Sequence, residues 1–247
     1  MEPAVLRDDM VDSLEHPSKG VVQSDDIGLA MRSVPRERFV DDESAAYADR
    51  SHRVLGTTVF PPSTVARLLE ALDPEPSANT LVVGAGVGYS VAVLAEVVGA
   101  RNVQAIELSR PVVRQARTNL ARAGYDSVLV EHGDGASGLP AYAPYDRILL
   151  ETGIVEPPRS LLDQLGPEGR LVLPKGPGVQ ELVAIEDGGV VAEHGTIAVE
   201  PMLVAGEEAG AIERNRTARE DREIADRAAQ RRRGWEREWI DWDGMGH

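Results

Sequence analysis

The segment TLVVGAGVGYS at residues 80–90 decides how the rest of the chain is interpreted. Its first four residues form a short apolar and β-branched run, which is typical of a strand buried on both faces of a sheet. The glycines that follow are spaced G-x-G-x-G, so the backbone can turn tightly and a ligand can approach it closely. This spacing differs from the dinucleotide pattern G-x-G-x-x-G, and no Lys follows as in the phosphate loop of nucleoside triphosphatases. The segment therefore predicts a strand, an uncharged glycine loop and a helix in succession.

Strand-like and helical segments alternate from this point onward. Strands are predicted at 80–83, 102–106, 127–131, 145–150 and 170–173, and helices at 88–98, 111–123 and 158–165. This alternation predicts an α/β fold with a doubly wound, mostly parallel sheet that has helices on both faces. Two Val- and Ile-rich runs at 180–186 and 190–204 then flank an Asp-Gly-Gly turn, which predicts a C-terminal antiparallel hairpin at the end of the sheet.

The segment before the glycine loop is predicted to be mainly helical. Residues 9–40 have helical character with one break near residues 17–20. Pro35 ends the second helical segment, because a proline disfavours helical geometry in its predecessor. Residues 41–62 show no period and are predicted to be loop. Residues 63–72 carry a helical apolar stripe, and Ser63 is predicted to cap that helix.

Residues 211–247 form a tail of different composition, with nine Arg against nine acidic residues. Glu–Arg pairs at three- and four-residue spacing predict a helix there. One face of that helix carries three tryptophans, Trp235, Trp239 and Trp242. This face would either dock on the protein's own body or form a homodimer contact. The predicted organisation is thus a domain at 1–210 followed by a charged helical extension at 211–247. The first 79 residues of the domain are an N-terminal helical region, on the side where a second substrate, the acceptor, would bind.

The chain has 247 residues and a formal net charge of −15, all of which lies in residues 1–210 because the tail is balanced. An acidic body repels nucleic-acid phosphates, so no nucleic-acid partner is expected. No apolar run approaches the roughly 20 residues that span a bilayer, and no signal peptide is visible, so a cytoplasmic protein without a membrane partner is expected. Cys is absent and the five His show no ligand spacing, so no metal site is predicted.

Acidic residues follow the next two predicted strands. Glu107 ends the second strand, where a carboxylate can accept hydrogen bonds from both hydroxyls of a ribose. Asp134, followed by Gly135, comes after the third strand, where it can accept a hydrogen bond from an adenine amino group. Ligands of open α/β sheets bind beyond the carboxyl ends of the strands, so these residues and the glycine loop share one crevice. The sequence therefore predicts a nucleoside-containing ligand, and an uncharged loop suits S-adenosyl-L-methionine.

Several stretches resemble the protein-L-isoaspartate (D-aspartate) O-methyltransferase family, from about residue 10 to residue 185. Besides the glycine loop they are MRSVPRERFV at 31–40, AYAD at 46–49, GDG at 133–135, APYD at 143–146 and QLGPEGRLV at 164–172. The V-P-R-x-x-F-V pattern is the most specific of them, because generic methyltransferases lack it. The resemblance implies an S-adenosylmethionine-binding fold and methyl transfer to the side-chain carboxylate of isoaspartyl residues in proteins, a repair reaction.

The resemblance also implies roles for individual residues of the cofactor pocket. The methionine end would lie against Gly84, Ala85, Gly86 and Gly88. Glu107, with Leu108 beside it, would take the ribose, and Asp134 with Gly135 would take the adenine. Thr152 falls where the family has a Thr after the fourth strand.

The acceptor side departs from the family pattern. In place of a D-x-P-L-P-I-G stretch and a T-I-S element, the chain reads DRSHRVLGTTVF at residues 49–60, which is one residue shorter. Phe60 stands at the position of the family's active-site Ser, and it has no hydroxyl with which to orient a carboxylate. Thr57 or Thr58 could hold the acceptor carboxylate instead.

Three other features of this region leave alternatives open. Arg50 or Arg53 could attract the acceptor carboxylate, or both could be solvated loop residues. His52 could be a base for another acceptor or an ordinary surface histidine. Val82 occupies the position of the acid that usually precedes the glycine motif.

Three functions follow from this combination of an intact cofactor side and a rebuilt acceptor side. The leading one is carboxyl O-methylation of isoaspartyl or aspartyl residues in proteins or peptides. The first alternative is a methyltransferase of the same fold that acts on a different acceptor. The second is a catalytically silent cofactor-binding or interaction module.

Overall fold

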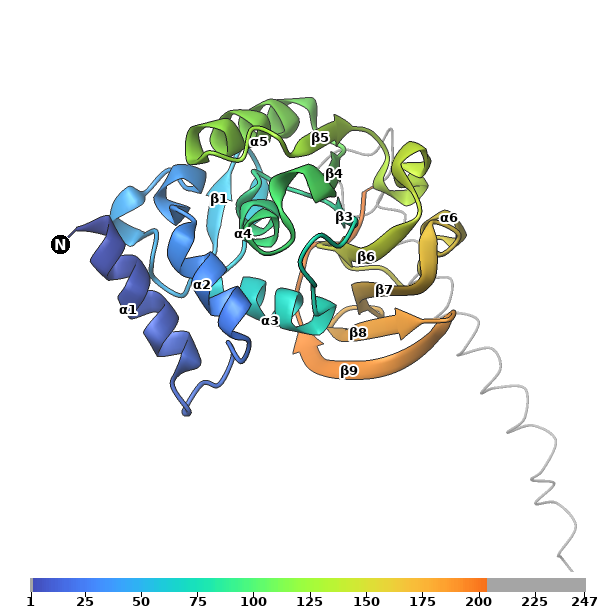
Figure 1. Ribbon diagram of the computed structural model, residues 1–247, viewed down its shortest axis with the longest axis horizontal. Coiled ribbons are helices and arrows are strands. Elements are labelled where there is room, and N and C mark those ends of the chain that lie inside the picture. Colours follow the sequence, from blue (N-terminus) through green and yellow to red (C-terminus); the bar gives the residue numbers. More distant parts are fainter. Residues whose placement is uncertain (1, 204–247) are drawn as a thin grey trace, which may run out of the picture.

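The computed structural model describes residues 2–203 (Figure 1). The predicted tail at 211–247, its tryptophan face and its dimer contact lie outside the described residues, as does the last residue of the strand predicted at 190–204. The boundary between the predicted domain and its tail therefore stays a prediction. Within the described part of the chain, no helix is both long enough and apolar enough to cross a membrane.

A seven-stranded sheet forms the centre of the molecule, in the order β5-β4-β3-β6-β7-β8-β9. Its strands are β3 (Thr80–Val83), β4 (Val103–Glu107), β5 (Leu129–His132), β6 (Tyr145–Leu150), β7 (Leu165–Lys175), β8 (Gln180–Glu186) and β9 (Gly189–Ile197). Strands β3 to β7 pair in parallel, whereas β8 pairs antiparallel with both β7 and β9. The mostly parallel α/β fold with a C-terminal antiparallel hairpin is confirmed.

The order of the strands reverses at β3. From β3 the chain moves outward through β4 to β5, and it then returns to the other side of β3 as β6. Val82 of β3 therefore pairs with Ala105 of β4 on one side and with Leu149 of β6 on the other. A crevice forms at such a reversal, beyond the carboxyl ends of the strands, and the glycine loop that follows β3 lies there.

Helices cover both faces of this sheet. They are α1 (Pro3–Glu15), α2 (Asp25–Ser33), α3 (Pro62–Leu72), α4 (Tyr89–Val98), α5 (Arg110–Ala123) and the short α6 (Arg159–Leu162). Because side chains alternate along a strand, Val82 packs with the apolar residues of α1 to α5, while Leu81 and Val83 pack on the opposite side with Leu161 of α6. Burying each such side chain contributes roughly 1.5–3 kcal/mol, so both faces of β3 must be covered.

The loop predicted at residues 41–62 contains a hairpin, so that prediction is wrong in part. Strands β1 (His52–Val54) and β2 (Thr57–Val59) form a two-stranded antiparallel sheet of their own. Leu55 and Gly56 join them, both with positive φ, as in the tight turns that suit hairpins. In each strand only the last residue, Val54 or Val59, is buried, so the strands are too short to show an alternating pattern.

Two helix predictions need correction. Helix α3 begins at Pro62, and the Ser63 side chain makes no capping bond; instead the Ser63 backbone N–H donates to Asp49 Oδ1 over 3.0 Å. The helix predicted at 158–165 is only the four residues of α6, because Leu165 already belongs to β7.

Candidate active site

A pocket of about 760 Å³ opens beyond the carboxyl ends of β3, β4 and β6. The β1–β2 hairpin forms one wall, and residues 198–203, which follow β9, form another. Gly153 holds this last segment in place: its N–H donates to the Glu200 carbonyl, and its carbonyl accepts from the Met202 N–H, both over 2.9 Å. The pocket therefore joins segments that lie far apart in the sequence.

The glycine loop forms the floor of the pocket at Gly84. This residue has φ +84°, and a Cβ on it would lie only 2.9 Å from Thr152 Cγ2, so a larger residue would collide with the end of β6. Gly84 and Thr152 both line the pocket, whereas Ala85, Gly86 and Gly88 lie in the loop behind the lining. The structure thus brings the predicted loop to the crevice, with Gly84 as its point of closest approach.

Glu107 lies at the carboxyl end of β4 and accepts hydrogen bonds from backbone N–H groups. Its Oε2 accepts from the Gly86 N–H over 3.2 Å, and its Oε1 accepts from the Ser109 N–H over 2.8 Å. Burial raises the pKa of the Glu107 carboxyl, and the hydrogen bonds from Ser109, Gly86 and Leu108 oppose that rise. Each carboxylate oxygen can accept more than one bond, so both remain able to receive a ribose hydroxyl. Glu107 and Leu108 both line the pocket.

The residues predicted to take the adenine are placed differently from one another. Gly135 lines the pocket, and a Cβ there would come within 2.5 Å of Val83 Cγ1, so only glycine fits against β3. Asp134 precedes it, and its Oδ1 accepts from the Ala136 N–H over 2.9 Å, which caps the short 3₁₀ turn at 135–137. An adenine contact from Asp134 stays a prediction.

The predicted acceptor residues Thr57, Thr58 and Phe60 all line the pocket. Thr58 Oγ1 donates to Glu200 Oε1 over 3.2 Å and accepts from Arg53 Nη1 over 3.0 Å. Arg53 also forms an ion pair with the same Glu200 carboxylate. Thr58 of β2 and Arg53 of β1 together hold the Glu200 carboxylate at the mouth of the pocket.

Two other residues of the rebuilt segment are directed elsewhere. Arg50 pairs with Asp42 over 3.2 Å and is not among the residues that line the pocket. His52 is also outside the lining, and burial lowers the pKa of its imidazole. Arg53 is outside the lining as well, but it differs from these two residues in contacting Thr58 and Glu200, which do line the pocket.

Arg36, from the V-P-R-x-x-F-V stretch, is a positioning residue that the sequence analysis missed. It is completely buried, and burial lowers the pKa of its guanidinium. Its Nε donates to the Ala46 carbonyl over 2.7 Å, and its Nη2 donates to the Phe60 carbonyl over 2.6 Å. The guanidinium lies 4.4 Å from the centre of the Tyr89 ring, at the start of α4. Arg36 therefore fixes the end of the acceptor hairpin relative to the helix that follows the glycine loop.

Replacing Arg36 with Met is expected to lower the free energy of unfolding by about 2–4 kcal/mol, because two carbonyls lose a charged donor. Urea unfolding would measure the change. The Arg38→Met variant is the control, since Arg38 is exposed two residues away and should shift stability by less than about 0.5 kcal/mol. Equal stability of the two variants would show that Arg36 does not hold the hairpin.

Glu151 is a second residue that the sequence analysis missed. It directly follows β6, lines the pocket and is only 8% exposed. Burial raises the pKa of its carboxyl to about 7, and the neighbouring Glu107 carboxylate adds to the rise. The rule that located Glu107, an acid at the carboxyl end of a buried strand, would also have found Glu151.

Metal ligands do not gather in the described part of the chain. Among residues 2–203, no group of three or more His, Asp or Glu side chains is arranged to hold a metal ion. The polar groups of the pocket are instead carboxylates, which accept hydrogen bonds, together with hydroxyls and backbone N–H groups. Such a set suits a nucleoside with an amino-acid portion.

A doubly wound sheet with a glycine loop at its reversal point and an acid at the end of the next strand is an arrangement that binds a nucleoside-containing cofactor. The comparisons with known proteins place it in the class of S-adenosylmethionine-dependent methyltransferases. A family model described as protein-L-isoaspartate(D-aspartate) O-methyltransferase matches residues 7–198. Protein-L-isoaspartate O-methyltransferase of Aeropyrum pernix is 44% identical over 184 residues, which are 72% of this chain and 70% of the relative. The enzyme of the same name from Methanopyrus kandleri is 41% identical over 212 residues, 82% of this chain and 92% of its own.

A solved structure of a protein-L-isoaspartate O-methyltransferase agrees with these relatives. It superimposes with a TM-score of 0.70 at 30% identity and covers 85% of this chain and 69% of its own. The chain belongs to the protein-L-isoaspartate (D-aspartate) O-methyltransferase family.

Proposed function

We propose that this protein transfers a methyl group from S-adenosyl-L-methionine to the side-chain carboxylate of isoaspartyl residues in proteins. The observation that carries the proposal is the single pocket in which Glu107 and the glycine loop face a carboxylate held by Thr58 and Arg53. Family membership supports both halves of the proposal. Protein substrates are compatible with the cytoplasmic location expected from the sequence.

Methyl transfer requires the protein mainly to position the two reactants. When bound, the cofactor supplies a methyl group on a positively charged sulphur. An acceptor carboxylate oxygen forms a bond to the methyl carbon while the carbon–sulphur bond breaks and its electron pair stays on sulphur. The carboxylate is already ionised near neutral pH, so no general base is needed. Holding both reactants in line and excluding water can provide most of the acceleration.

The acceptor side needs a group that orients a carboxylate, and Thr58 and Arg53 supply it in place of the serine that Phe60 replaces. They already hold the Glu200 carboxylate, which stands in for the carboxylate of an acceptor. An incoming isoaspartyl carboxylate would displace Glu200 and take over its bonds. Phe60 and Thr57 would then form the adjoining wall of the acceptor pocket.

An isoaspartyl peptide and its normal-aspartyl twin, incubated with labelled S-adenosylmethionine, test the function. We expect base-labile methyl ester on the isoaspartyl peptide alone. Label only on other acceptors would replace this function with methylation of a different substrate. Cofactor binding without any turnover would favour a silent binding module.

Opposite effects on the KM for the isoaspartyl peptide are expected from two substitutions at the pocket mouth. Thr58→Val removes one hydrogen bond to the acceptor and should raise the KM by about 3- to 10-fold. Glu200→Gln removes the competing carboxylate and should lower the KM a few-fold, as expected for an exposed ion pair of about 1 kcal/mol or less. Steady-state kinetics at saturating cofactor would measure both. A KM that rises in both variants would show that Glu200 belongs to the acceptor site rather than competing for it.

A further inference from the structure

Glu151 is placed beside the glycine loop by the pairing of β6 with β3. Its backbone N–H donates to the Val83 carbonyl over 2.9 Å, which brings the ends of the two strands together. Its Cβ lies 3.9 Å from the position that a Cβ on Gly84 would occupy. The Glu151 side chain therefore begins at the point where the loop comes closest to the pocket.

The carboxyl group of Glu151 lacks a cation among the described residues. Its Oε1 is buried without a hydrogen-bond partner, and the Ser90 hydroxyl, in the first turn of α4, is its side-chain hydrogen-bond partner. The charged side chain that acts on it is Glu107, which has the same sign. A buried, unpaired carboxylate is costly, so a ligand that brings a positive charge to this position would be bound strongly.

The register of the sheet shows on which face the Glu151 side chain lies. Val82 pairs with Leu149, and both pack in the cluster on the α1–α5 face. Because side chains alternate, Glu151 lies on the same face as Leu149, two residues further along the strand. The Glu151 side chain is therefore on the face of the sheet that α4 covers, where its hydrogen-bond partner Ser90 lies.

We propose that Glu151 is the counter-ion of the α-ammonium group of the cofactor's methionine portion. This inference rests on the proposed function. The ribose is assigned to Glu107, which leaves the sulphonium and the ammonium as the positive charges for Glu151. A carboxylate directed at the sulphonium would itself be a methyl acceptor, and the acceptor groups Thr58 and Arg53 belong to the hairpin wall instead. The ammonium is the partner that Glu151 can neutralise without being methylated.

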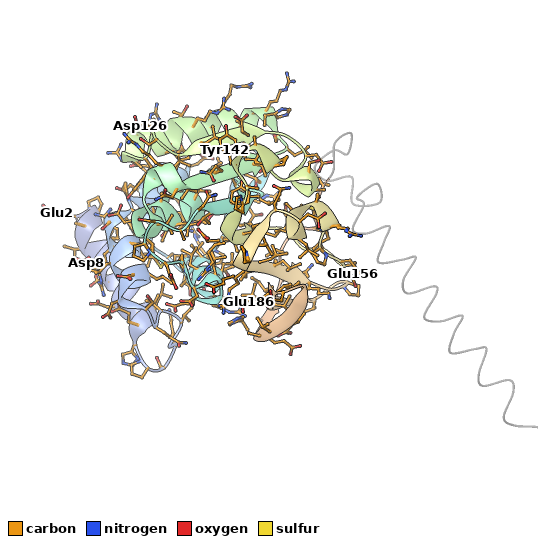
Figure 2. All side chains as sticks on the ribbon, turned by 45° about the vertical axis from the view of Figure 1, so that its right-hand side comes forward. Glu2, Asp8, Asp126, Tyr142, Glu156 and Glu186 are labelled. Atoms are coloured by element: carbon orange, nitrogen blue, oxygen red, sulfur yellow. The ribbon has the colours of Figure 1, made fainter. Side chains whose placement is uncertain are left out.

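Isothermal titration with two ligands tests this assignment. S-adenosylhomocysteine contains the ammonium and lacks the sulphonium, whereas 5′-methylthioadenosine contains the same nucleoside and lacks both. At pH 8 the Glu151→Gln variant should bind S-adenosylhomocysteine roughly 30-fold more weakly, the low end for a broken buried charge pair, and methylthioadenosine within about twofold. Glu156→Gln is the matched control, because Glu156 lies in the same loop but is exposed (Figure 2).

The pH dependence of binding is an independent readout. Because burial raises the pKa of Glu151, the carboxyl must lose a proton to pair with the ammonium. The ratio of the S-adenosylhomocysteine and methylthioadenosine affinities should rise with pH up to about 7 and then level off. Taking the ratio cancels the contribution of Glu107, since the ribose is common to both ligands. In Glu151→Gln the ratio should not change with pH.

Several outcomes would overturn the assignment. Equal weakening of both ligands in Glu151→Gln would mean that the residue only supports the pocket. Weakening of S-adenosylmethionine but not of S-adenosylhomocysteine would make the sulphonium its partner. If the variant does not fold, an S-adenosylhomocysteine analogue lacking only the ammonium takes its place: the natural chain should bind it roughly 30-fold more weakly than S-adenosylhomocysteine, and equal affinity would refute the inference. Failure of the natural chain to bind either nucleoside would instead overturn the proposed function.

Discussion

At pH 8, and without ligand, the Glu151→Gln variant is expected to be more stable than the natural chain by roughly 3 kcal/mol. Burial raises the pKa of Glu151 from its ordinary 4.5 to about 7 in the folded protein. Between these two values the folded state holds a proton that the unfolded state has released. The contribution of Glu151 to the free energy of unfolding therefore falls as pH rises from 4.5 to about 7, and each pKa unit corresponds to about 1.4 kcal/mol.

Urea unfolding of both proteins between pH 4.5 and pH 8 would measure this difference. The gain from Glu151→Gln should be small near pH 4.5, should grow up to about pH 7 and should then stay constant. Glu156→Gln, which alters an exposed carboxylate, should follow the natural chain at every pH. A constant difference across the whole range would mean that Glu151 does not change its protonation. A residue that destabilises the free protein and is needed by the bound one is typical of a binding site.

Glu107→Ala is expected to weaken the binding of S-adenosylhomocysteine by about two to four orders of magnitude. The carboxylate is fixed by the N–H groups of Gly86 and Ser109, so its remaining lone pairs are already oriented towards the pocket. Each hydrogen bond from a ribose hydroxyl to a charged acceptor contributes about 1.5–3 kcal/mol, and two such bonds are lost together. Isothermal titration would measure the change.

Methylthioadenosine distinguishes this effect from that of Glu151. Because it contains the ribose, its affinity should fall in Glu107→Ala by the same factor as that of S-adenosylhomocysteine. Glu131→Ala, on the neighbouring strand and outside the pocket lining, should leave both affinities within about twofold. Unchanged methylthioadenosine binding in Glu107→Ala would show that Glu107 does not bind the ribose.

The cofactor side was largely predictable from the sequence because it follows from backbone rules. A strand buried on both faces, such as β3, is recognisable in a single run of residues, and ligand groups collect at the carboxyl ends of parallel strands. Those two rules indicate the glycine loop, Glu107 and Asp134, and the family resemblance adds Gly135. They did not separate Gly135, which lines the pocket, from Asp134, whose Oδ1 caps a turn.

The acceptor side was much less predictable because its contacts are long-range. Thr58 and Glu200 are hydrogen-bonded although they lie 142 residues apart in the sequence, and no local pattern links them. Strands β1 and β2 have three residues each, which is too short for a period to be visible. Arg36 is similar: its motif indicated the family, but its bonds to the carbonyls of Ala46 and Phe60 depend on the tertiary structure.

The β1–β2 hairpin belongs to a separate two-stranded sheet, and this has an evolutionary consequence. Mutations in residues 52–59 alter no hydrogen bond of the seven-stranded sheet, so substrate preference can drift while the nucleoside machinery stays unchanged. This separation also makes the hairpin a natural cassette for exchange between relatives, provided that Arg36 remains to anchor the grafted segment at its Phe60 end.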